Sequence, residues 1–88
     1  AQKAPHRVRD RVHYLVRLAR CYLLQREVER ACEVATEAAA LSEAIGSARV
    51  VERLREFHGA LDPFAASKPA IDFHELYAST VAQRLSVN

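Results

Sequence analysis

Small and apolar residues recur at helical spacing through the first half of the chain, and this run constrains the fold more than any other feature. It consists of Leu15, Leu18, Ala19, Tyr22, Ala31, Ala35 and Ala38. The first four and the last three each fit one face of a helix, because residues three or four apart lie on the same side. The nine-residue step in between leaves room for a turn near residues 25–27. We therefore expect two helices that pack very closely, since alanines let backbones approach.

The composition favours helices throughout. The chain has 88 residues, half of them hydrophobic, with two glycines and three prolines. Ala, Leu, Arg and Glu dominate, and all four are good helix formers. We expect an all-α fold in a single domain, residues 1–88, or in a piece of a longer protein. A chain of this length buries only about 60% of its extended surface, so a partner or neighbouring sequence is expected to add stability.

The pattern predicts antiparallel hairpins built from about four helices. The first hairpin covers residues 5–45, with helices at 5–24 and 28–45. Gly46 follows the second helix, where a left-handed glycine commonly ends a helix. Ser47 then offers a side-chain oxygen that can cap the next helix.

A third helix is expected at residues 48–58, within a segment that spans 47–61. Gly59 is expected to stop this helix. The loop that follows, residues 62–71, is too apolar for a flexible linker, and Phe64 is expected to tuck against the core.

The last helix, residues 72–86, has the clearest predicted start. Asp72 and Glu75 stand three residues apart, which matches a capping box. Ile71 and Leu76 can form the accompanying hydrophobic staple. The apolar face of this helix either covers the end of the third helix within the chain, as a cap, or docks on a second copy to give a homodimer. Its residues are Phe73, Leu76, Tyr77, Val81 and Leu85.

The net charge of +2 hides a strong asymmetry. Residues 1–26 carry seven Lys and Arg against Asp10, whereas residues 27–45 carry five Glu against Arg30. A basic helix followed by an acidic one suits neighbouring antiparallel helices. Each exposed pair contributes at most ~1 kcal/mol, so we expect the pattern to set orientation and partner choice.

Several function classes find no support in the sequence. The spacing of the four histidines lacks the i,i+3 or i,i+4 pairs of helical metal sites, so no metal is expected. Cys21 and Cys32 are expected to be reduced thiols. No phosphate loop or nucleophile motif is present, so no catalytic residue, cofactor or enzyme activity is expected. No leader or membrane span is visible, which favours a cytoplasmic protein without membrane contact.

The opening run resembles a tetratricopeptide repeat over residues 12–45. Arg26 and Glu27 stand where that motif has Gly-Asp, and Glu43 replaces its terminal proline. Only one good repeat is visible. The matching residues are Leu15, Leu18, Ala19, Tyr22, Ala31, Ala35 and Ala38.

Residues 11–61 are also similar to the C-terminal helical-repeat region of actinobacterial helix-turn-helix regulators of the XRE type. The similarity lies in the strings at 18–23, 31–35, 45–50 and 53–55. It implies a sensor or interaction region that mediates assembly and affects DNA only through a separate helix-turn-helix domain, for which this chain has no candidate.

Repeats of this kind bind along a groove lined by the first helix of each hairpin. The resemblance therefore implies a site for a peptide or protein partner, because arginines bind carboxylates and phosphates through paired hydrogen bonds. The alternatives are a solvated basic face, or a direct nucleic-acid contact through the first helix. The candidate contacts are His13, Val16, Arg17, Arg20, Arg49 and Arg53.

Overall fold

The computed structural model describes residues 4–43 and 45–86, with side chains from Arg7 to Ser79. Four α-helices and one 3-10 turn account for most of this part, which confirms the predicted all-α fold of about four helices. No strand occurs in the described ranges. The elements are α1 (Ala4–Leu24), α2 (Val28–Ser42), α3 (Ala48–Ala60), η1 (Asp62–Phe64) and α4 (Lys68–Ser86).

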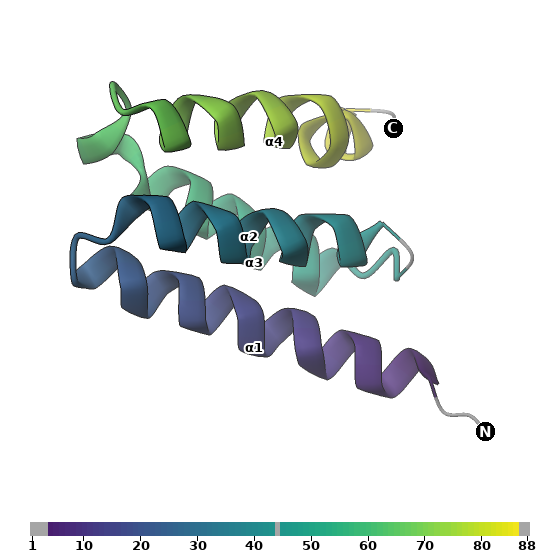
Figure 1. Ribbon diagram of the computed structural model, residues 1–88. Coiled ribbons are helices and arrows are strands. Elements are labelled where there is room, and N and C mark those ends of the chain that lie inside the picture. The colour runs from purple at the N-terminus through teal and green to yellow at the C-terminus, as the bar shows by residue number, and fades with distance from the viewer. Residues whose placement is uncertain (1–3, 44, 87–88) are drawn as a thin grey trace.

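The helices run alternately up and down, so that consecutive helices are antiparallel (Figure 1). α2 lies between α1 and α4, and α3 lies behind α2. α3 contacts each of the other three helices, and α2 contacts α4 directly. This arrangement leaves one side of α1 and one side of the α2–α4 pair facing solvent.

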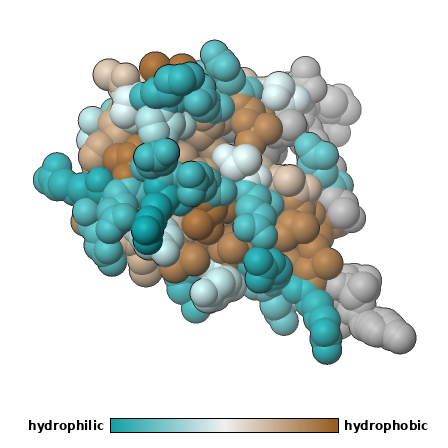
Figure 2. Space-filling model, in the orientation of Figure 1, coloured by the Kyte–Doolittle hydropathy of each residue, from teal (hydrophilic) through white to brown (hydrophobic). Residues whose placement is uncertain are grey.

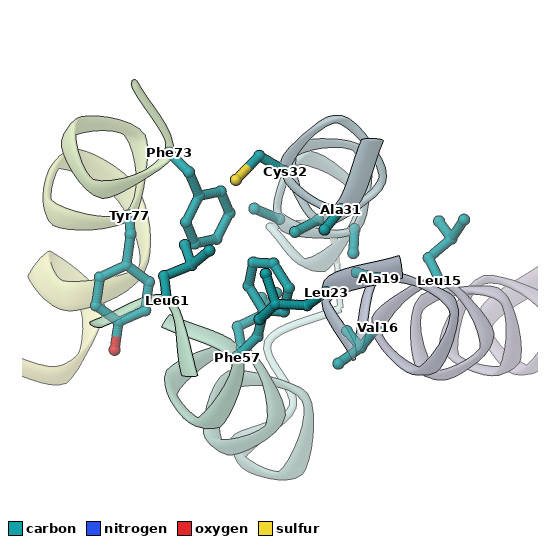
Figure 3. Close-up of a cluster of buried hydrophobic side chains, with 14 of the residues drawn as sticks. Leu15, Val16, Ala19, Leu23, Ala31, Cys32, Phe57, Leu61, Phe73 and Tyr77 are labelled. Carbon is teal, nitrogen blue, oxygen red and sulfur yellow. The ribbon is translucent and has the colours of Figure 1, made fainter. Parts of the chain in front are cut away.

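α1 and α2 share the most extensive contact in the molecule. It is made through fully buried alanines. Ala19 of α1 lies beside Ala31 of α2 (Figure 3), and Ala35 and Ala38 continue the buried face of α2. A salt bridge between Arg11 and Glu37, 3.0 Å long, joins the same two helices at their surface. The closely packed hairpin predicted from the sequence is therefore confirmed.

The turn between α1 and α2 is a Schellman motif centred on Arg26. The Glu27 amide donates to the Tyr22 carbonyl at 2.9 Å, and the Arg26 amide donates to the Leu23 carbonyl at 2.9 Å. The motif needs a left-handed residue, and Arg26 supplies it with φ of 65°. The Arg30 guanidinium covers the Tyr22 ring at 5.8 Å and closes the turn from outside.

The aromatic core lies where α3 meets α4 (Figure 3). The rings of Phe57 and Phe73 meet edge to face, with centroids 5.3 Å apart. Leu54 of α3 is fully buried, and the buried Leu61 lies between Phe73 and Tyr77 (Figure 3). As predicted, Phe64 packs half-buried against this core.

The predicted ends of α2 and α3 are both wrong. α2 ends at Ser42 rather than at residue 45; residue 44 lies outside the described residues. Gly46 does have the expected left-handed conformation, with φ of 68°. The Ser47 hydroxyl caps α3 by accepting from the Val50 amide at 3.4 Å. Gly59 does not stop α3, which continues to Ala60.

The predicted capping box of α4 is wrong. α4 begins at Lys68, and Asp72 is an interior residue whose carboxylate pairs with the Lys68 ammonium at 3.3 Å. The early start allows Ala70 to join Phe73 in the core, since residues three apart share a face. Ile71, the predicted staple residue, is 45% exposed.

Replacing Arg26 with glycine should stabilise the protein. A non-glycine residue in the left-handed region is strained by about 1 kcal/mol, and Arg26→Gly removes this strain. We expect the free energy of unfolding to rise by about 0.5–1 kcal/mol in urea titrations followed by circular dichroism. Gln25→Gly, at a position without a positive φ, should instead lower it; a gain there equal to that of Arg26→Gly would contradict the strain at Arg26.

Enlarging an interhelical alanine should force the first hairpin apart. Ala35→Leu adds three carbons where α1 and α2 are in contact, so we expect a loss of about 1–3 kcal/mol in the same measurement. Ala40→Leu makes the same change at an exposed position of α2 and should alter stability by less than about 0.5 kcal/mol. Equal effects of the two substitutions would argue against close packing at Ala35.

Candidate functional site

A basic face forms where α1 lies beside α3. His13 is partly buried on α1, and the positive charges of Arg53, Arg49 and Arg9 all act on it. Burial is the main reason why the pKa of His13 lies below its usual value, and the two α3 arginines lower it further; Asp10 opposes them. The structure thus brings together three of the predicted contacts, His13, Arg49 and Arg53. We call these three residues and Arg9 the basic face.

Arg17 and Arg20 lie farther along α1 and are exposed. Within the described part of the chain, neither they nor Arg49 and Arg53 form an ion pair, which leaves four guanidinium groups uncompensated. Val16 differs from the other predicted contacts, because it is only 3% exposed and belongs to the core (Figure 3). Val16 can therefore shape the face from below but cannot touch a partner.

The predicted docking face of α4 is largely covered within the chain. Phe73 is 1% exposed and Tyr77 is 7% exposed, both packed beside α3 (Figure 3). Leu76 is half-buried. Val81 and Leu85 lie on α4, but their side chains are outside the described residues. Docking on a second copy through Phe73 and Tyr77 would require this packing to open.

A groove that the sequence analysis did not anticipate lies between α2 and α4. Its volume is about 680 Å³. The face that carries these two helices shows hydrophobic surface between hydrophilic side chains (Figure 2). The lining residues are Glu29, Cys32, Glu33 and Thr36 of α2, with Lys68, Pro69, Asp72, Phe73 and Leu76 of α4.

The two cysteines have different surroundings. Cys32 is buried with its sulfur toward Phe73, and burial together with the charge of Asp72 raises its pKa to about 11. A thiol with so high a pKa stays protonated and is a poor nucleophile. Cys21 is exposed, and no hydrogen bond links it to a histidine in the described ranges. The side chains described also contain no group of three or more metal-ligating residues.

A histidine pair joins α3 to α4. His58 Nε2 and His74 Nδ1 are 2.7 Å apart, so one ring nitrogen donates a hydrogen bond and the other accepts it. The His58 ring also stacks on Tyr77, with centroids 4.2 Å apart. Burial, and then the charge of His74, lowers the pKa of His58, whereas Asp62 raises it. Sequence reasoning treats these histidines as separate, because sixteen residues part them and only the fold brings them together.

Lowering the pH should destabilise the folded chain, because His58 and His13 become protonated less readily in it than in the unfolded chain. The pKa values of His58 and His13 lie below the unfolded value of about 6.5, so the unfolded state binds more protons. The free energy of unfolding should therefore fall as the pH drops through about 6.5 and level off below the folded pKa values.

The test is urea unfolding between about pH 7.5 and pH 5.5. The variant H58Q should show a smaller difference between the two pH values than the wild type, and H13Q with H58Q a smaller difference still. If the free energy of unfolding of the wild type and of H58Q depended on pH to the same extent, His58 would not be the origin of the effect.

Comparisons with protein-family models, with curated proteins and with solved structures gave no match to this chain. Among the described residues, no helix combines the length and the apolar character that crossing a bilayer requires.

Proposed function

We propose that the chain is a non-catalytic interaction and regulatory module that binds an anionic segment of a peptide or protein on the basic face. In a bacterial transcription regulator, it would be the sensor part, and DNA would be bound by a separate helix-turn-helix domain. The tetratricopeptide-like pattern of the first hairpin agrees with this role. A cytoplasmic location is part of the same proposal.

The observation that carries the proposal is the uncompensated charge around His13. Arg9, Arg49 and Arg53 converge there from two helices, and only Asp10 opposes them. By contrast, the neighbouring Arg55 of α3 is paired within the chain, with Glu52. A guanidinium presents five N–H donors, and an anionic group bridging α1 and α3 would satisfy several of them at once.

His13 gives the basic face a neutral, polar centre. Its lowered pKa keeps the imidazole uncharged near neutral pH, so it can donate one hydrogen bond and accept another. A carboxylate held by the arginines would accept from the imidazole N–H. Since the contacts come from both α1 and α3, binding would fix these helices relative to each other. Occupancy of the basic face would in this way change how copies of the protein assemble.

Reversing the charge of Arg53 should weaken binding of an acidic peptide. With a fluorescein-labelled peptide rich in aspartate and glutamate, we expect Arg53→Glu to raise the dissociation constant about tenfold in an anisotropy titration. Arg7→Glu is the matched control, because Arg7 is exposed and lies about 160° around α1 from Arg9. It should change the constant by less than about twofold.

Two results would argue against the proposal. Equal weakening by both substitutions would indicate general charge attraction rather than a site. Tighter binding of generic duplex DNA than of the peptide, with a steep salt dependence, would favour the nucleic-acid contact instead.

A further inference from the structure

The glutamates at the N-cap of α2 and along the helix fall into two groups according to their partners. Glu27 pairs with Arg30, and Glu37 pairs with Arg11. Glu29 and Glu33 line the α2–α4 groove and form no ion pair with any described residue. These two carboxylates stand four residues apart, so they follow each other along one rim of the groove.

The α4 side of the groove carries a charge that is already paired, and the floor of the groove is apolar. Asp72 is already paired with Lys68, so the lining as a whole carries two uncompensated negative charges. Beneath them lie Cys32, Phe73 and Leu76, which make an apolar floor. The groove thus offers apolar contact flanked by negative charge, and an anionic ligand such as a nucleic acid would be repelled.

The side of α1 that faces away from the core is complementary to the groove, because it carries positive charge and exposed apolar side chains. Tyr14 is 54% exposed and Leu24 is 83% exposed, so this side of α1 offers apolar contact at two points ten residues apart. Arg17 and Arg20 stand between them and are uncompensated within the described part. We call this surface the outer stripe of α1; it consists of Tyr14, Arg17, Arg20, Cys21 and Leu24.

The two surfaces also agree in length. From Tyr14 to Leu24 the outer stripe extends about 15 Å, and the α4 wall of the groove, from Lys68 to Leu76, extends about 12 Å. A chain cannot fill its own groove with this stripe, because α1 packs against α2 through its other side. The occupant must therefore come from another molecule.

From this complementarity of charge, apolar character and length, we propose that the α2–α4 groove binds the outer stripe of α1 from a second copy of the chain. Arg17 and Arg20 of one copy lie against Glu29 and Glu33 of the other, and Leu24 lies on the apolar floor. The contact joins two different surfaces, so it either closes into a symmetric pair that uses both contacts or extends into a chain of copies. Arg17, Arg20 and Leu24 lie on the same side of α1 as His13 but farther toward the end of the helix, so the stripe adjoins the basic face without sharing a residue with it.

Complementation between two charge-reversed variants tests this contact. R17E/R20E reverses the stripe and leaves the groove intact, whereas E29K/E33K reverses the groove and leaves the stripe intact. In sedimentation equilibrium the wild type should self-associate, and each variant alone should associate at least about tenfold more weakly. An equimolar mixture of the two should associate again, because it brings together an intact stripe and an intact groove.

The controls keep failure of this proposal separate from failure of the proposed function. R7E and E56K reverse exposed charges outside both surfaces and should leave self-association unchanged; circular dichroism checks that all variants fold. A wild-type chain that stays monomeric at about 100 μM, or variants that associate as the wild type does, would overturn the proposal. Neither result would affect acidic-peptide binding by wild type and Arg53→Glu, which tests the basic face alone.

Discussion

The contact between the alanines of α1 and α2 is the constraint on which the rest of the structure depends. Because Ala31, Ala35 and Ala38 add little bulk, α2 approaches α1 closely on one side. Cys32 follows Ala31 and is turned about 100° around the helix, so it faces Phe73 of α4. α2 therefore packs against α1 on one side and α4 on another, and Phe57 and Phe73 fill the space between α2, α3 and α4.

The elements that the sequence predicts well are those set by local spacing. The stripe of α1, the left-handed Gly46 and the Ser47 cap each depend on residues within about one or two turns of one another. The start of α4 differs from the prediction for a related reason. Asp72 and Glu75 satisfy the local capping pattern, but burial of Ala70 beside Phe73 depends on α3, and this tertiary packing favours a helix that begins earlier.

In the candidate site, too, the features set by helix spacing can be predicted from the sequence, whereas those set by contacts between distant segments cannot. His13, Arg49 and Arg53 could be placed on one face because the hairpin pattern sets α1 beside α3. The sequence also predicts Val16 on that face, but Val16 is buried, because helix spacing alone does not say which edge of a stripe another helix will cover. The α2–α4 groove and the pairing of His58 with His74 could not be predicted, because both depend on how α4 returns across α2 and α3.

The distribution of charge says more about association than about stability. An exposed ion pair such as that between Arg11 and Glu37 contributes at most ~1 kcal/mol, so pairing every surface charge would add little to the fold. Charges left unpaired and sorted by sign act differently, because they guide encounters and select partners over distances that packing cannot reach. Among the described residues, Arg17 and Arg20 of α1 and Arg49 and Arg53 of α3 form no ion pair, and neither do Glu29 and Glu33 of α2 in the groove. The four helices therefore carry cationic and anionic surfaces at different places, and both proposed contacts depend on this separation of charge.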